Sequence, residues 1–267
     1  MCLSLFVQKY VVFRAIRLQR FVYWLRKLYF CANNRISDME KTIGMLAAMD
    51  VEYRQVADML SETSVQEMGP HKYLVGKLGD KKIVLMQCGI GKVNASSGVT
   101  DMILHFHPQC VISTGVAGGI DTKLKVMDVV VSEETCYHDV FCGDEYLPGQ
   151  VQGLPSSFKC DEHLVETAVS LQSPVRIVKG LICTGDQFIS DRAQLNDIKV
   201  RFPEGLAVDM ESSAIAHVCH LYDVPFVSFR IISDTPGVDN HLDQYLNFFD
   251  TMANKSFTVT KLFIESI

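Results

Sequence analysis

The 267-residue sequence lacks the cysteine patterns of disulfide-rich and zinc-binding proteins. Its nine cysteines are odd in number and irregularly spaced, with no C-x-x-C pair and no cysteine and histidine set at zinc-ligand spacing. His217 and His220 have no acidic residue between them of the kind found in metalloprotease helices. We therefore expect reduced, mostly buried thiols in a cytoplasmic protein that uses neither a metal nor another cofactor.

An excess of positive charge and the common nucleotide-binding signatures are also absent. The formal net charge of −6 argues against a nucleic-acid partner. The glycine-containing stretch from Cys88 to Asn94 fits neither the dinucleotide-binding pattern nor the P-loop pattern. A hydrophobic content of 48% and a charged content of 21% are ordinary for a globular enzyme. The length allows one large α/β domain or two small ones.

Acidic residues are missing from the first 37 positions, which contain seven basic residues. Charge interrupts the apolar runs of this segment too often for it to span a bilayer, and it has no signal-peptide core. A basic amphipathic helix lying on an anionic membrane is one interpretation. We favour an N-terminal extension, residues 1–38, that is dispensable or precedes a natural start at Met39, which the mass of the native polypeptide would test. Residues 39–267 are then expected to form a single domain.

From Met39 onward, apolar stretches alternate with helical patterns, which predicts one αβα domain with a mixed sheet. The expected strands are Thr42–Ala48, Val111–Gly119, Val129–Thr135, Val175–Ile182 and Pro225–Asp234, with a hairpin from Tyr73 to Gln87. The expected helices are 50–60, 161–171, a segment ending at Lys199, and 242–265.

The stretch from Ala207 to His217 predicts a change from strand to helix. A buried strand is expected to end near Val208, and a helix capped by Ser212 or Ser213 is expected to follow. Glu211 then lies at the junction, where open α/β sheets bind ligands. A carboxylate there suits a polyol such as ribose, whereas the alternative is an ordinary surface position.

A second expected strand also ends in a carboxylate. Asp234 precedes the breaker cluster Thr235-Pro236-Gly237, so two neighbouring strands are expected to present acids on one rim. Cleavage of a glycosidic bond needs a proton donor and negative charge near an oxocarbenium-like sugar. Asp50 is expected to cap the first helix. Glu52, in the same turn, either complements the helix dipole or is a third acid on the rim.

Seven separate motifs from Lys41 onward resemble the nucleosidases that cleave 5′-methylthioadenosine and S-adenosylhomocysteine. These are IGMLAAMDVE, CGIGKVNA, TGVAGG, YHD, TGDQFI, VDMESSAIAHVCH and FRIISD. The resemblance implies a purine nucleoside phosphorylase-type fold, a three-layer αβα sandwich around a mixed, partly closed sheet. It also implies a homodimer, action on 5′-deoxyadenosine, and a place in methionine salvage and the recycling of S-adenosylmethionine by-products.

The resemblance assigns catalytic roles to three positions. Asp234 looks like the general acid that protonates adenine N7, with Ser233 orienting it, and Glu52 looks like the carboxylate that activates water. These roles require burial to raise the pKa of Asp234, while Glu52 and Glu211 stay ionised.

The same resemblance assigns the substrate-binding residues. Glu211 and Met210 resemble the ribose clamp, with Arg230 on the same side of the sugar. Phe188 would stack on adenine, although spacing alone suits a core phenylalanine equally, and the backbone of Ile189 would read the base edge. Met49 would line the region of the sugar and alkylthio group. The remaining predicted contacts are Cys88, Ala117 and Gly118.

The sequence departs from the family pattern at three places. Cys88 replaces a serine, and a thiol is a weak hydrogen-bonding group. Asp209 replaces a glutamate and is expected to lie outside direct contact with substrate. The segment from Phe141 to Gly149, near the expected subunit contact, is short, and either Tyr245 or Phe248 is expected to cover the 5′-substituent.

Three other functions remain open at this stage. A phosphorolytic relative needs a phosphate site, but the AAMDVEYR segment puts acids where phosphate would bind. A futalosine-type hydrolase would use the same bond chemistry on another 5′-substituent. A non-catalytic nucleoside-binding protein, tethered to a membrane by residues 1–37, would not need all three carboxylates.

Overall fold

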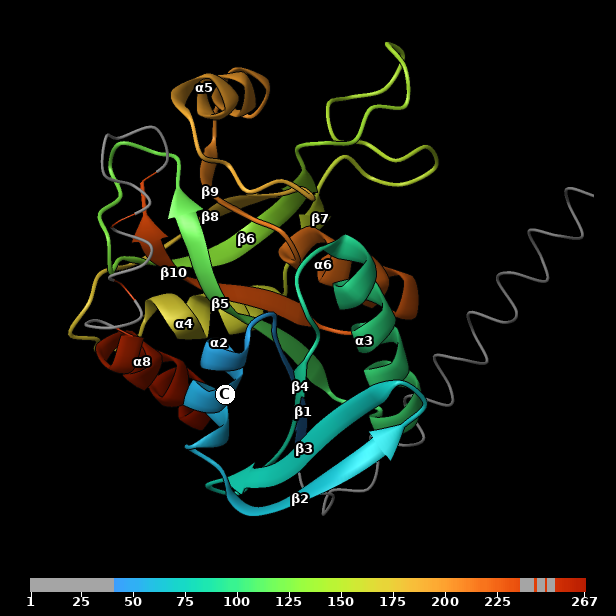
Figure 1. Ribbon diagram of the computed structural model, residues 1–267, viewed down its shortest axis with the longest axis vertical. Helices are drawn as coiled ribbons and strands as arrows, with labels where there is room; N and C mark the ends of the chain where they lie inside the picture. Colours follow the sequence, from blue (N-terminus) through green and yellow to red (C-terminus); the bar gives the residue numbers. More distant parts are fainter. Residues whose placement is uncertain (1–40, 236–242, 244–247, 249–252) are drawn as a thin grey trace, which may run out of the picture. The chain divides into compact units, whose positions relative to one another are not determined.

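The computed structural model describes residues 41–235, 243, 248 and 253–267, and Figure 1 shows how their elements are arranged. The strands are β1 Thr42–Ala47, β2 Ser61–Met68, β3 His71–Leu78, β4 Lys81–Gln87, β5 Cys110–Gly119, β6 Val129–Tyr137, β7 Phe158–Lys159, β8 Ile177–Thr184, β9 Gly205–Asp209 and β10 Phe226–Asp234. The helices are α2 Asp50–Ala57, α3 Lys92–Phe106, α4 Glu162–Val169, α5 Arg192–Arg201, α6 Ser212–Tyr222 and α8 Ala253–Ser266. The predicted extension and most of the predicted helix before Ala253 lie outside the described residues.

The strands form one mixed sheet that closes partly on itself. Strand order runs β10-β6-β8-β9-β5-β1-β4-β3-β2, and β10 also pairs with β5. The strands β5, β10, β6, β8 and β9 therefore make a ring, from which β1, β4, β3 and β2 extend. β5 is parallel to β1 and β10 but antiparallel to β9. This topology confirms the predicted mixed, partly closed sheet.

Two hydrophobic cores lie on the two faces of the sheet. One packs β1, β5 and β10 against α2, α4 and α8 through residues such as Met45, Phe229 and Phe263. The other packs β3 and β4 against α3 and α6 through residues such as Tyr73 and Ile215. Figure 1 shows these two groups of helices on opposite sides of the strands. The arrangement is the αβα sandwich expected from the alternation of strand and helix patterns.

The two strands that end in carboxylates are not neighbours, contrary to expectation. β5 lies between β9 and β10, and its residue Gly118 pairs with Val208 on one side and with Asp234 on the other. β9 reaches this point from the opposite direction because it runs antiparallel to β5. The sequence gives strand ends but no directions, so the convergence was predicted correctly and its topology was not.

The polar edge of the sheet was not predicted. β2 has the sequence SETSVQEM and is mostly exposed, so it has no apolar alternation from which to recognise a strand. The neighbouring hairpin of β3 and β4 forms as predicted. Among the described residues, all seven cysteines are free thiols, and no helix is long and apolar enough to cross a membrane.

Candidate active site

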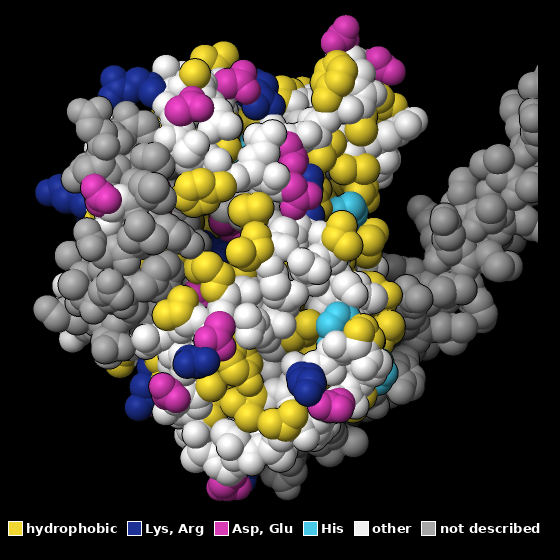
Figure 2. Space-filling view, in the orientation of Figure 1, with side chains coloured by type: hydrophobic (Ala, Val, Ile, Leu, Met, Phe, Trp, Pro, Cys, Tyr) yellow, Lys and Arg dark blue, Asp and Glu magenta, His cyan; other side chains and the backbone are white. Residues whose placement is uncertain are grey.

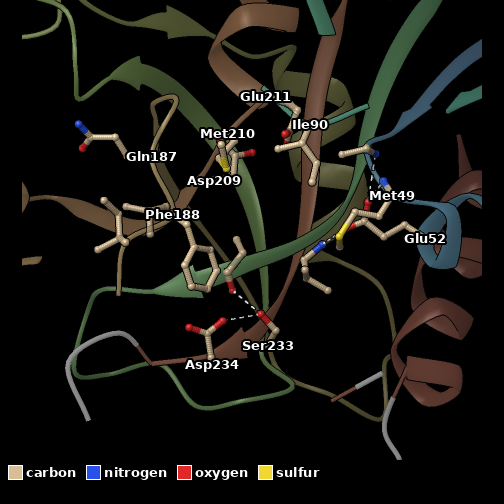
Figure 3. Close-up of a pocket in the computed structure, with 16 residues that line it drawn as sticks. Met49, Glu52, Ile90, Gln187, Phe188, Asp209, Met210, Glu211, Ser233 and Asp234 are labelled. Atoms are coloured by element: carbon tan, nitrogen blue, oxygen red, sulfur yellow. Dashed lines mark hydrogen bonds between the residues drawn. The ribbon is translucent and has the colours of Figure 1, made fainter. Parts of the chain in front are cut away.

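A cavity opens where the ends of β1, β5, β9 and β10 meet, and Figure 3 shows its lining. Glu52 lies on one side, Asp234 and Ser233 on another, and Glu211 with Met210 on a third. The sequence predicted ten of its lining residues: Met49, Glu52, Ala117, Gly118, Phe188, Ile189, Met210, Glu211, Ser233 and Asp234. Three acids distant in sequence therefore border one cavity.

Glu52 is held by the backbone at the start of its own helix and by β5. Its Oε2 accepts hydrogen bonds from the amides of Ala48 and Met49 at 3.0 Å each. Its Oε1 accepts from the amide of Val116 at 2.9 Å. The predicted cap by Asp50 is wrong, because Met49 occupies the cap position and Glu52 reaches back to it. Glu52 thus satisfies the helix terminus and also faces the cavity.

A buried arginine connects Asp209, which ends β9, with Glu211, which follows it. Arg230 is 1% exposed, and its Nη2 lies 2.9 Å from Asp209 Oδ2 and 3.6 Å from Glu211 Oε2. Asp209 also accepts from the Thr184 hydroxyl at 2.5 Å and from the amide of Ser212. Glu211 occupies the cap position of the helix and Asp209 accepts from its first amide, so the predicted cap by Ser212 or Ser213 is wrong. Asp209 is part of the cavity lining, while its carboxylate binds Arg230 and Thr184, so the expectation that it does not contact substrate stays a prediction.

Burial changes the ionisation expected of the two acids near Arg230. Desolvation raises the pKa of Glu52, and the Arg230 charge and the three backbone hydrogen bonds offset it only in part. Desolvation likewise raises the pKa of Glu211 to about 7, against the lowering effect of Arg230. Burial therefore opposes the expected ionised state of both acids, and it brings the pKa of Glu211 close to neutral pH.

Asp234 ends β10 beside a hydroxyl donor. The Ser233 hydroxyl donates to Asp234 Oδ1 at 2.6 Å and lies 3.4 Å from the carbonyl oxygen of Ala117. Asp234 and Ser233 are buried, yet both line the cavity. Figure 3 shows this pair below the ring of Phe188, across the cavity from Glu52. The geometry matches the predicted pairing of an acid with an orienting serine, whose catalytic roles remain predictions.

Two predicted contacts lie behind the cavity and not on its surface. Arg230 is absent from the lining and contacts the cavity through its ion pair with Glu211. Cys88 is also absent, and its thiol bonds to the carbonyl oxygens of Ala47 and Gly89. Phe248 packs in the core and does not cover the cavity, while Tyr245 lies outside the described residues.

Six lining residues were missed. They are Ala48, Ile90, Val116, Gln187, Val208 and Asp209. Each lies within two residues of a predicted contact, so proximity in sequence was the available signal. Phe188 is 49% exposed at the cavity, which suits an aromatic surface for a flat ligand better than a core position.

The fold and the cavity place this chain in the Phosphorylase superfamily, whose sequence pattern it matches over residues 42–265. It is 38% identical to the 5′-methylthioadenosine/S-adenosylhomocysteine nucleosidase of Desulfotalea psychrophila, over 84% of this chain and 97% of the relative. The corresponding nucleosidase of Bacillus thuringiensis is 39% identical over 77% of this chain and 91% of the relative. The chain belongs to the family of 5′-methylthioadenosine/S-adenosylhomocysteine nucleosidases.

Solved structures agree with this assignment. The Neisseria meningitidis nucleosidase, in complex with methylthio-immucillin-A, has a TM-score of 0.81 and 35% identity, covering 85% of this chain and 100% of its own. The Streptococcus pyogenes enzyme, in complex with 5-methylthiotubericidin, has a TM-score of 0.80 and 30% identity, covering 86% and 99%. Relatives of this fold therefore bind nucleoside analogues.

Proposed function

We propose that this chain hydrolyses the N-glycosidic bond of 5′-methylthioadenosine and S-adenosylhomocysteine, and of 5′-deoxyadenosine, releasing adenine. The observation that carries this proposal is the convergence of Glu52, Glu211 and Asp234 on one cavity that also holds the half-exposed Phe188. These residues supply what the reaction needs: a proton donor, an anion beside the sugar, a site for water, and an aromatic surface for the base.

In this mechanism, the base and the sugar bind on different walls. Phe188 stacks on adenine, and Asp234 gives a proton to N7 as the bond to the sugar breaks. Ser233 donates to Oδ1 of Asp234 and so helps to fix the orientation of the carboxyl group, which lines the cavity. Glu211, with Met210 beside it, accepts from the ribose hydroxyls, and its negative charge stabilises the positive sugar. Because that role needs the ionised form, activity should decline as pH falls below about 7.

Glu52 is suited to hold the attacking water. A carboxylate has about four acceptor positions. Three of those of Glu52 are filled by the amides of Ala48, Met49 and Val116, so its orientation is fixed. The remaining position can accept from one water and aim it at the sugar carbon.

The same hydrogen bonds disfavour a phosphorolytic reaction. Backbone amides at a helix start are a common binding site for phosphate. Here the carboxylate of Glu52 already occupies the amides of Ala48 and Met49. A phosphate anion would have to displace a buried carboxylate or lie against it, which Coulomb repulsion opposes. Water is therefore the better nucleophile for this cavity.

An assay of the released base, which is adenine from the two adenosine nucleosides and hypoxanthine from inosine and futalosine, tests the proposal. Methylthioadenosine, adenosylhomocysteine, futalosine and inosine are each incubated with the enzyme, with and without phosphate. We expect adenine from the first two substrates and a free sugar product at any phosphate concentration. Ribose 1-phosphate formation would indicate a phosphorylase, preferential cleavage of futalosine would indicate the other hydrolase, and binding without turnover would indicate a binding protein.

A homodimer in the cytoplasm is the second part of this proposal. Val93 and Phe141 are each 78% exposed, and the half-exposed Ile90 and Phe188 lie in the cavity lining. Figure 2 shows hydrophobic side chains around a hollow near the middle of this face. Exposed apolar side chains of this kind suit contact with a second subunit. We expect analytical ultracentrifugation to give a dimer and Val93→Asp to weaken it, whereas a monomeric wild-type chain would contradict this part.

A further inference from the structure

Three motifs outside the proposed reaction centre meet beside Glu211. Lys92 begins α3 in the GIGK motif, Asp139 follows β6 in the YHD motif, and Asp186 follows β8 in the TGD motif. Lys92 Nζ lies 2.8 Å from both carboxylate oxygens of Asp139. The amide of Asp186 donates to Asp139 Oδ2 at 2.9 Å, and the amide of Lys92 donates to Asp186 Oδ1 at 2.8 Å. We call this closed ring of contacts the Lys92 network.

The Lys92 network touches the cavity through the chain on both sides of it. The amide of Gly91, directly before Lys92, donates to Glu211 Oε1 at 2.9 Å. Gly91 has a φ of 96°, and a Cβ there would lie 3.0 Å from Asp186 Oδ1, so the turn suits glycine. Asp186 is followed by Gln187 and Phe188, which line the cavity. The network therefore links the amide that holds Glu211 to the loop that presents the aromatic ring.

The Lys92–Asp139 pair of the network is partly sheltered from water, whereas Asp186 is 47% exposed. The side chains of Lys92 and Asp139 are 22% and 15% exposed. Burial alone would raise the pKa of Asp139, but hydrogen bonds from Lys92 and from the amide of Asp186 outweigh it and leave the pKa lowered. Asp139 thus remains an anion at neutral pH, and its contacts are less screened than those of a surface pair.

We propose that the Lys92 network holds the Gly91 amide against Glu211 and holds the Phe188 loop against the cavity. Lys92, Asp139 and Asp186 are then positioning residues for the glycosidic cleavage. This inference rests on the proposed function, because its effect is measured through that reaction. Lys92, Asp139 and Asp186 do not line the cavity, so they act by fixing the positions of residues that do. Displacing such residues by about 1 Å can cost on the order of 100-fold in rate.

The test compares Lys92→Met and Asp139→Asn with Lys179→Met. Lys179 also bridges two acids, Glu133 at 3.3 Å and Glu166 at 2.7 Å, but outside the cavity. With methylthioadenosine as substrate, we expect kcat/KM to fall roughly 10- to 100-fold in the two network variants. Lys179→Met should stay within about twofold of wild type, as expected for an exposed ion pair. Lys92→Arg keeps the charge and should restore most of the activity.

A pH profile separates positioning from simple electrostatics. Glu211 is faced by Arg230 of β10, Asp209 of β9, Glu52 of α2 and the Cys88 thiol, and the Gly91 amide lowers its pKa. If the network acts by holding that amide, both variants move the acidic limb of kcat/KM to higher pH. If only charge matters, Lys92→Met moves the limb up and Asp139→Asn moves it down.

The outcomes distinguish this inference from the proposed function. Shifts of the same sign, together with the loss of kcat/KM, support the network. Opposite shifts, or unchanged kcat/KM in both variants of an active enzyme, overturn the network and leave the function standing. Failure of wild-type and Lys179→Met enzymes to release adenine overturns the proposed function, and the network's assigned role falls with it.

Discussion

The carboxylates on the two sides of the cavity have different partners. On one side, Glu52 and Glu211 are buried close to the guanidinium of Arg230, and backbone amides bind both acids. On the other side, Asp234 receives a hydrogen bond from the neutral Ser233 hydroxyl. We refer to these as the Arg230 side and the Ser233 side.

The difference suggests how one cavity performs two kinds of chemistry. The buried cation and the aligned amides lower the pKa of the two acids against the larger effect of burial, and so help them to act as anions beside the sugar and the water. A hydroxyl partner adds no net charge, so it is compatible with a carboxyl group that delivers a proton. The separation of roles therefore follows from the partners that the strand ends provide, because all the acids involved are buried.

The largest effect is expected when the acid of the Ser233 side is replaced. Asp234→Asn removes the acidic proton but keeps the shape, so turnover should fall by about 10²–10⁴ while nucleoside binding is largely retained. Adenine release gives the rate, and titration calorimetry with methylthioadenosine gives the affinity. Ser233→Ala is the matched control, which loses one orienting hydrogen bond of about 1 kcal/mol and should lose roughly fivefold. Unchanged turnover in Asp234→Asn would remove the proton-donor role.

The next largest effect is a loss of stability, expected when the cation of the Arg230 side is replaced. Arg230→Met leaves Asp209 and Glu211 buried without their shared cation, which should cost about 3–5 kcal/mol in the free energy of unfolding. Urea unfolding measures the loss. Arg54→Met removes an exposed pair with Asp50 and should cost less than about 1 kcal/mol. Equal losses in the two variants would mean that burial of the Arg230 side contributes little.

A pH dependence of stability sharpens the comparison further. The pKa of Glu211 is about 7 in the folded chain, against an ordinary 4.5. Between these pH values the folded state binds a proton that the unfolded state releases, so stability falls as pH rises through the window. The full difference corresponds to about 3 kcal/mol. Glu52 contributes with the same sign, because its pKa is also raised.

Glu211→Gln isolates this contribution. Urea unfolding at pH values from 4.5 to 7.5 should show wild type losing up to about 3 kcal/mol relative to the variant, with no further divergence above pH 7. Comparing the two proteins cancels the contributions of acids elsewhere in the chain. Parallel stability curves would show that Glu211 titrates normally in the folded state.

The sequence indicated where strands end, but it did not indicate strand direction or the buried contacts between strands. Glu211 and Asp234 could be placed near strand ends because apolar runs stop where strands stop, whereas the roles of these acids and of Glu52 were predicted from the family resemblance. The antiparallel approach of β9 could not be predicted, because hydrophobic patterns carry no strand direction. The contact of Asp209 with Arg230 could not be predicted either, because Arg230 lies on β10, which β5 separates from β9.

Polar networks were the other element that pattern reading missed. The YHD and TGD motifs could be recognised, but spacing gave no sign that they meet Lys92. The same limit applies to helix caps. Asp50 and Ser212 were reasonable caps on local grounds, yet Glu52 and Asp209 bind the terminal amides because tertiary packing places them there.

The smallest expected effect tests whether the Cys88 thiol takes part in the reaction on the Arg230 side or only packs behind the cavity. Its thiol donates to the carbonyl oxygens of Ala47 at 3.5 Å and Gly89 at 3.3 Å, behind the cavity lining. Burial raises its pKa to about 12, and the nearby Glu211 adds to this, so it stays a neutral thiol throughout the working range. Cys88→Ser offers a stronger donor of similar size, and one improved hydrogen bond contributes about 1 kcal/mol at most. We therefore expect kcat/KM to change by less than about fivefold. A larger change, measured by adenine release, would mean that the side chain at position 88 interacts with Glu52 or its water. Cys88 would then belong to the Arg230 side although it does not line the cavity.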